Sequence, residues 1–127
     1  MKIIKNTSHY NTKKLKSMFC FIHNQLAKHE GKLSWWSDLN IKIQHRQHCR
    51  SGRAFLKKTY RKDWDMFLSM STEIDVEDIA QLFAHELMHN YGYKHHQFNR
   101  YPLTTKEVNQ VQEKFTLGCL INDLNTN

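Results

Sequence analysis

Apolar residues recur along this chain with two different periods, which predict helices and strands in a mixed order. Residues 12–29 carry apolar side chains at helical spacing, and Gly31 is expected to end that helix. The stripe consists of Leu15, Met18, Phe19, Ile22 and Leu26. Residues 2–5 are β-branched in part, and residues 39–46 alternate apolar and polar positions, so both segments are predicted to be strands.

The middle of the chain predicts a loop, a turn and two further strands. Trp35-Trp36 follows the first helix in a loop and is expected to pack on that helix. Residues 50–52 (RSG) have the composition of a turn. Residues 53–58 form a candidate strand whose lysines suit an exposed sheet edge, and residues 64–70 form another.

Two helices are predicted in the C-terminal half. Asp75 is a suitable N-cap, and the apolar stripe that follows it consists of Val76, Ile79, Ala80, Phe83 and Leu87. Thr104 and Glu107 form a capping box that opens a last helix, which is expected to run through Phe115 to near Gly118. This order of elements predicts an α+β fold, a small twisted mixed sheet backed by two helices and closed by a third.

The size and composition of the chain fit one domain. Because 39% of its 127 residues are hydrophobic and 12% are aromatic, residues 1–127 are expected to bury a single core. The N-terminus lacks the apolar run of a signal peptide, and no segment suggests a membrane span, so we expect a cytoplasmic protein. The three cysteines form no C-x-x-C pair and are expected to be reduced: Cys20, Cys49 and Cys119.

The formal charge of +7 is unevenly spread. No acidic residue lies between Asp38 and Asp63, and the basic side chains there are Lys42, Arg46, Arg50, Arg53, Lys57, Lys58, Arg61 and Lys62. A basic stretch over residues 42–62 is typical of a solvated face, and it is also compatible with binding of nucleic acid.

Residues 85–95 (HELMHNYGYKH) combine the residue types of a zinc site. His85 and His89 are four positions apart, so on a helix they lie on one face and can bind the same ion. Glu86 lies on an adjoining flank, close enough to reach a water at the metal. Gly92 can adopt a positive φ and end the helix, which lets the chain fold back so that His95 supplies a third nitrogen. Three protein ligands leave one position of a Zn²⁺ ion open for water.

The extended motif H-E-x-x-H-x-x-G-x-x-H resembles the signature of metzincins, a group of zinc metallopeptidases, and the order of elements is similar to a minimal zincin domain. The resemblance implies His85, His89 and His95 as ligands of one Zn²⁺ and Glu86 as general base. Metzincins also have a methionine turn downstream of the third ligand, whereas no methionine follows Met88 here. The chain therefore resembles a zincin with a metzincin-like motif, similar to small SprT-like or phage-encoded metallopeptidases.

The third ligand has two alternatives. His96 is adjacent to His95 and could replace it if the turn is longer. Glu107 begins the last helix at a distance similar to that of the downstream glutamate of gluzincins, but Gly92 would then have no role. His45 and His48 are expected to lie on different faces of a strand end, so a second metal site is not predicted there.

The expected reaction is hydrolysis of a peptide bond in a peptide or protein substrate. Zinc would acidify water and polarise the carbonyl, and Glu86 would take the proton and pass it to the leaving amine. The oxyanion needs a further donor, for which Tyr93 is the first candidate beside Tyr91 and Tyr101. By resemblance, the substrate would lie along an edge strand at residues 53–57.

A second hypothesis belongs to a different class of protein. A basic protein that binds nucleic acid, with a structural or non-catalytic zinc site, would carry the same histidines. A peptidase acting on proteins bound to DNA would combine the two hypotheses. A fourth protein ligand at the metal would favour the structural site, and an open position would favour the enzyme.

Overall fold

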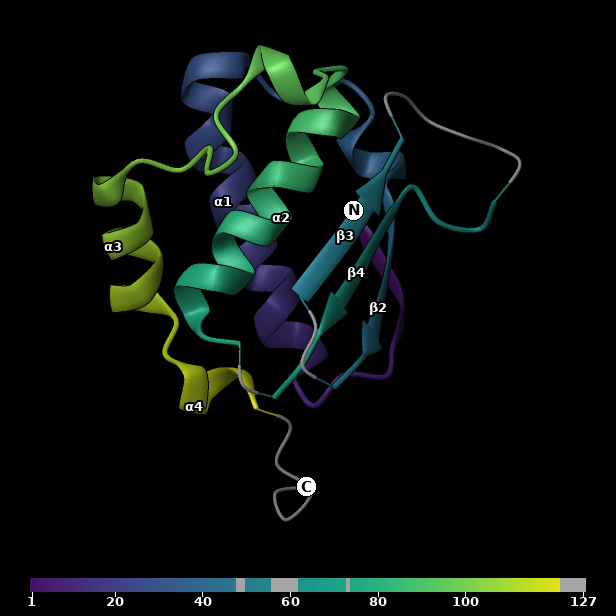
Figure 1. Cartoon of the computed structure of the whole chain (residues 1–127), viewed down its shortest axis with the longest axis vertical. Coiled ribbons are helices and arrows are strands. Elements are labelled where there is room, and N and C mark those ends of the chain that lie inside the picture. The colour runs from purple at the N-terminus through teal and green to yellow at the C-terminus, as the bar shows by residue number, and fades with distance from the viewer. Residues whose placement is uncertain (48–49, 56–61, 73, 122–127) are drawn as a thin grey trace.

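The computed structural model describes four stretches of this chain, residues 1–47, 50–55, 62–72 and 74–121. Within them, four strands form one mixed sheet in the order β1-β2-β4-β3. β1 (Lys2–Asn6), β2 (Asn40–His45) and β4 (Met66–Met70) run parallel to one another, and β3 (Arg50–Ala54) is antiparallel to β4. The edge strands are therefore β1 and β3 (Figure 1).

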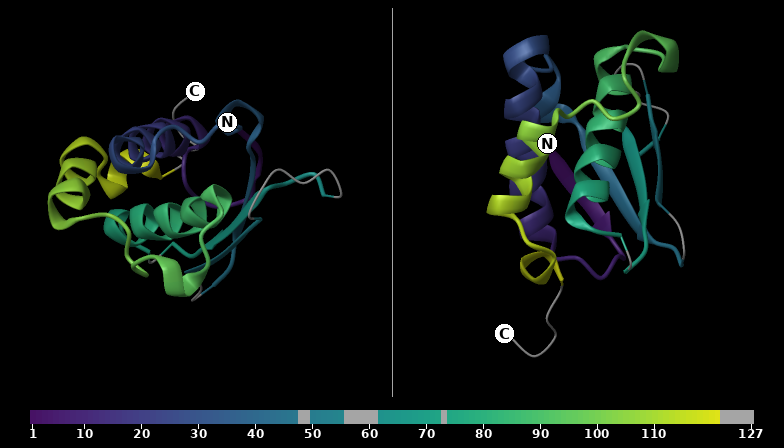
Figure 2. Two further views of the ribbon diagram at one scale, coloured as in Figure 1. Left: turned by 90° about the horizontal axis from the view of Figure 1, so that it is seen from above. Right: turned by 60° about the vertical axis from the view of Figure 1, so that its left-hand side comes forward.

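The helices lie on one side of this sheet, which confirms the predicted α+β fold class. α1 (Thr12–Glu30) contacts β1, and α2 (Val76–Tyr91) contacts β3 and β4 (Figure 2). α3 (Thr105–Lys114) packs beside α1 and α2, and the short α4 (Leu117–Leu120) contacts α1. Among the described residues, none of the helices combines the length and the apolar character needed to cross a membrane.

Two rows of side chains on the sheet face the helices and form the floor of the core. The strand register sets Ile41 opposite Met66, and Ile43 opposite Leu68. Each of these side chains is at most 1% exposed. Phe19 of α1 stacks on Phe83 of α2 with a ring-centroid distance of 4.1 Å, so the two helices are joined by aromatic packing. Full burial of side chains of this size stabilises a fold by roughly 1.5–3 kcal/mol each, before the cost of ordering the chain.

The boundaries of several predicted elements are wrong. Residues 50–52 are the first three residues of β3 and not a turn, since they pair with Met70, Ser69 and Leu68 of β4. β3 ends at Ala54, and residues 56–58 of the predicted strand lie outside the described residues. β4 begins at Met66, two residues after the predicted start.

The predicted last helix consists of two separate helices. α3 opens at the Thr104 capping box as predicted but ends at Lys114. Phe115 and Thr116 both have extended backbone, which interrupts the helix before α4 begins. The interruption lets Phe115 and Leu120 turn into the core, where they are 6% and 0% exposed.

His23 is a buried, neutral histidine on the core side of α1. It is 3% exposed, its Nε2 accepts a hydrogen bond of 3.1 Å from the Leu33 N–H, and its ring stacks on Trp36 at 4.0 Å. Trp36 thus packs on α1, as expected. Burial, together with the positive charges of Lys32 and the N-terminus, lowers the pKa of His23 to about 4.

This histidine is expected to destabilise the fold in acid. Between its ordinary pKa of about 6.5 and the folded value of about 4, the unfolded chain binds a proton that the folded chain does not. Stability is therefore lost as the pH falls through this window, and His23 should account for about 2 kcal/mol between pH 7 and pH 5. His23→Gln keeps an acceptor for Leu33 but does not titrate. Urea unfolding of the metal-free protein at both pH values should show the smaller loss in the variant, and equal losses would contradict the assignment.

Candidate metal centre

α2 is held in place by its cap and by its apolar stripe. The Asp75 side chain accepts a 2.8 Å hydrogen bond from the Asp78 N–H, which satisfies a free donor at the helix start. Ile79, Phe83 and Leu87 are 0% exposed against the core. His85 and His89 lie on an adjoining flank of the same helix, and both are half-buried. The sequence thus aims two imidazoles away from the core from one rigid element.

The end of α2 brings the third histidine back to the first two. Gly92 has a φ of 108° in the left-handed region, and its N–H bonds to the carbonyl groups of His89 and Met88. A β-carbon is strained in this conformation, so glycine is required for the turn. The chain then enters a short 3₁₀ helix, η2 (His95–Gln97), which starts with His95.

His85, His89 and His95 form one cluster. Each offers a ring nitrogen, and the three ligand atoms lie within 4.8 Å of one another. Ring-centroid distances are 5.1 Å between His85 and His89, 5.3 Å between His85 and His95, and 4.6 Å between His89 and His95. His96 is not part of the cluster.

Backbone carbonyl groups fix the orientation of two of these rings. His85 Nδ1 lies 2.9 Å from the Arg100 carbonyl oxygen, and His89 Nδ1 lies 2.8 Å from the Tyr93 carbonyl oxygen. Because a carbonyl can only accept, we assign the ring proton to Nδ1 in both residues, which leaves Nε2 with a lone pair for a metal. Burial also lowers the pKa of His85, against the effect of this hydrogen bond, and so favours the neutral ligand form.

Phe98 forms an aromatic base for the cluster. Its ring centroid lies 5.1 Å from that of His85, 5.2 Å from that of His89 and 6.5 Å from that of His95. It follows the third histidine by three positions and is half-buried. An apolar side chain against all three rings restricts their rotation and excludes water from one side of the cluster. The donor set, the ring orientation and this packing together suit a group that could hold a metal ion.

Glu86 is the carboxylate next to the cluster. It is 5% exposed, and burial raises the pKa of its carboxyl to about 7 because the charged form loses hydration. Its side chain packs against the backbone of Gly52 in β3: a β-carbon at position 52 would lie 2.5 Å from Glu86 Cγ and 2.8 Å from Oε2. The sheet therefore approaches Glu86 so closely that only glycine fits there.

A cavity of about 260 Å³ opens beside Glu86 and His85. Edge strand β3 contributes Ser51 and Gly52 to its wall, and the chain after η2 contributes Arg100 and Tyr101. The histidine cluster, the Glu86 carboxylate and the cavity are thus adjacent. The part of this wall that Ser51 and Gly52 supply was not predicted, because residues 50–52 resemble a turn in composition. A glycine inside a strand was the available signal, since it marks close approach of another group.

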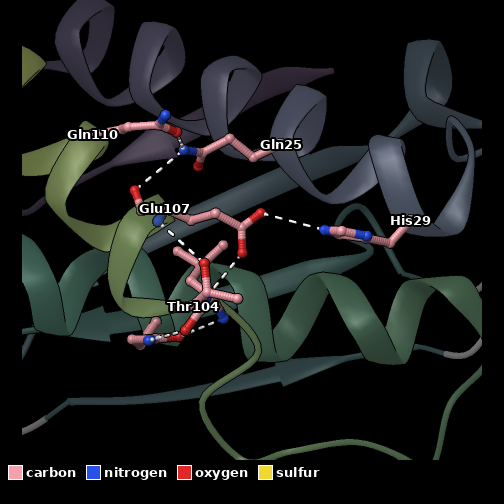
Figure 3. A network of polar contacts seen from close by, with 7 residues as sticks. Gln25, His29, Thr104, Glu107 and Gln110 are labelled. Carbon is pink, nitrogen blue, oxygen red and sulfur yellow. Dashed lines mark hydrogen bonds and ion pairs between the residues drawn. The ribbon is translucent and has the colours of Figure 1, made fainter.

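Glu107 is held between α1 and α3 and does not belong to the cluster. Its Oε1 accepts a 2.9 Å hydrogen bond from the Thr104 N–H, and its Oε2 lies 3.9 Å from His29 Nε2 (Figure 3). Its carbonyl accepts a hydrogen bond from Gln25 Nε2. The carboxylate serves the capping box and the packing of α3, and the structure does not bring it to the other predicted ligands.

The predicted tyrosine candidates lie in different places. The Tyr93 hydroxyl donates to Glu30 Oε2 at 2.6 Å, and the Tyr91 hydroxyl donates to the Gly31 carbonyl at 2.7 Å, so both are directed to the end of α1. Tyr101 is 53% exposed and lines the cavity. Of the three predicted tyrosines, Tyr101 is therefore the one that lines the cavity beside Glu86. His48 of the predicted basic loop lies outside the described residues.

Comparison of the chain with protein-family models, with curated proteins and with solved structures finds no match.

Proposed function

We propose that this protein is a zinc-dependent metallopeptidase that hydrolyses peptide bonds in peptide or protein substrates. The observation that carries the proposal is the convergence of His85, His89 and His95, with Nε2 of the first two available, beside a cavity that also receives the buried carboxylate of Glu86.

Each group has a separate task in this proposal. Zinc bound by the three imidazoles would supply Lewis acidity, which polarises a carbonyl and makes water more acidic. Glu86 accepts the proton of the attacking water and delivers it to the departing amine. Its burial keeps the carboxylate poorly hydrated, which increases its basicity. Tyr101 lines the same cavity and would donate a hydrogen bond from its hydroxyl to the oxyanion.

The position of β3 suits an extended substrate. β3 is an edge strand whose described residues pair with β4 on one side, and Ser51 and Gly52 reach the cavity. An extended peptide can add to such an edge through main-chain hydrogen bonds, which places its carbonyl groups in a regular row beside Glu86. The protein would then distinguish between substrates only by those substrate side chains that enter the cavity.

The proposal is tested by metal analysis and hydrolysis with a matched pair of variants. His95→Ala is expected to weaken zinc binding by more than about 100-fold, because loss of outer-sphere partners alone costs 10–100-fold. His96→Ala removes the neighbouring, exposed imidazole and is expected to bind zinc like the wild type. Zinc content after dialysis against a graded chelator and cleavage of an unfolded protein substrate would be measured for all three proteins.

Two results would overturn the proposal. Equal zinc affinity in the two variants would show that His95 is not a ligand of the metal. The wild-type protein could also bind one zinc ion tightly and yet cleave neither unfolded proteins nor peptide libraries. That result would favour the rival hypothesis of a structural metal site.

A further inference from the structure

The face of the sheet opposite the helices carries a row of basic and aromatic side chains. Lys5 of β1 lies opposite Lys42 of β2, Lys42 lies opposite Phe67 of β4, and Phe67 lies opposite Arg53 of β3. Residues directly opposite one another on paired strands share one face of a sheet. The neighbouring row, which includes Ile43 and Leu68, faces the helices, so this row faces away from them.

An aromatic cluster continues the row at the β3–β4 end of the sheet. The Trp64 ring stacks on Phe55 with a centroid distance of 5.2 Å and lies 5.5 Å from Phe67 at a tilt of 56°. The ammonium group of Lys62 lies 5.6 Å from the centre of the Trp64 ring. All three rings are half-buried and so keep part of their surface in contact with solvent. We call Lys5, Lys42, Arg53, Phe67 and Trp64 the outer face.

The outer face is hollowed beside Phe67. A cavity of about 270 Å³ there is lined by Lys5, Thr7, Lys42, Ile43, Gln44 and Phe67. Figure 2 shows α1 and α2 on the opposite face of the sheet, and α2 carries His85 and His89 of the metal centre. Lys42 forms a 3.6 Å ion pair with Asp63, whose side chain is 68% exposed and can move away. The hollow therefore combines cations, polar groups and one aromatic wall.

We propose that the outer face binds single-stranded nucleic acid. Phosphates contact the cationic groups of Lys5, Lys42 and Arg53, and an unpaired base stacks on Phe67 in the hollow. We infer a single-stranded rather than a double-stranded nucleic acid because aromatic rings that lie against a sheet can stack only on unpaired bases. The charge of the row is the reason for choosing a polyanion over an apolar protein surface. This binding is independent of hydrolysis, because no residue of the outer face belongs to the metal centre.

The test uses the full chain and a fluorescein-labelled single-stranded oligo(dT) of 20 nucleotides, measured by fluorescence anisotropy. The double variant Lys5→Gln/Lys42→Gln is compared with Lys13→Gln/Lys106→Gln, which removes the same charge from exposed positions on α1 and α3. The outer-face pair should weaken binding and lower the slope of log K against log salt by about 1.4, at ~0.7 per lost phosphate contact. The helix pair should leave the slope unchanged.

Phe67→Leu tests stacking separately from charge. It keeps an apolar side chain on the sheet and should weaken oligo(dT) binding roughly tenfold without changing the salt slope. Thermal unfolding of each variant shows whether the fold is kept. Equal weakening by the two lysine pairs, tighter binding of a DNA duplex than of the single strand, or no binding by the wild type would each overturn the proposal. Unchanged oligo(dT) binding by Glu86→Gln would show that nucleic-acid binding does not depend on peptide hydrolysis.

Discussion

Glu86→Gln is expected to abolish most peptide hydrolysis while the protein keeps its zinc. Removing a positioned general base lowers the rate by roughly 10²–10⁴-fold, because an amide cannot accept the proton of the attacking water at neutral pH. The metal should stay, since its ligand atoms come from His85, His89 and His95. Glutamine has nearly the same shape as glutamate, so the close packing against Gly52 is preserved.

Three quantities are measured on the same preparations: kcat/KM for an unfolded protein substrate, the zinc stoichiometry, and the free energy of unfolding in urea. Stability should stay equal or rise slightly, because the variant no longer buries a carboxylate that is only 5% exposed. His89→Ala is the contrasting control, which should lose zinc and hydrolysis together. Hydrolysis retained at the wild-type rate in Glu86→Gln would exclude Glu86 as the base.

Much of the fold could be predicted because local signals agree with tertiary packing. The helical spacing from Leu15 to Leu26, the cap at Asp75 and the capping box at Thr104 each depend on neighbours within a few positions. The cluster of three histidines was predicted for the same reason: His85 and His89 share a helix face, and Gly92 permits the turn that returns His95. These are properties of a continuous stretch of residues 85–95.

The surroundings of the site could not be predicted because they depend on a backbone group, on an unspecific apolar side chain and on a distant strand. The Arg100 carbonyl that orients His85 offers no side-chain signal, since every residue has a carbonyl. Phe98 packs against all three imidazoles, and the sequence carries no specific signal for it because many apolar residues would satisfy the same pattern. The β3 wall was missed because Gly52 is ambiguous between a turn and a close approach until the sheet register is known.

Gly52→Ala is expected to produce nearly the same loss as Glu86→Gln, although residue 52 has no catalytic group. The new β-carbon would lie 2.5 Å from Glu86 Cγ, so either the carboxylate rotates away or β3 moves outward. A displacement of about 1 Å at a reacting group can cost 10²-fold in rate. The crowding should also destabilise the fold by about 1–3 kcal/mol. Zinc binding should persist, because the clash is with Glu86 and not with the histidines.

Gly118→Ala provides the matched control for this prediction. An added β-carbon there meets nothing within 4 Å, and Gly118 lies inside α4 with ordinary helical backbone, so the same chemical change should leave hydrolysis intact. Wild-type hydrolysis and stability in Gly52→Ala would show that β3 does not position the carboxylate.

The double variant Gly52→Ala/Glu86→Gln separates positioning from general damage. If Gly52 acts only by placing the carboxylate, the second substitution has nothing further to remove, and the double variant should be no slower than Glu86→Gln alone. If instead Gly52→Ala distorts the metal ligands or the substrate edge of β3, the two losses should multiply and zinc affinity should fall. Hydrolysis rates and zinc affinities are therefore measured for the wild type, the two single variants and the double variant. They decide whether β3 acts on catalysis only through the contact between Gly52 and Glu86 of α2.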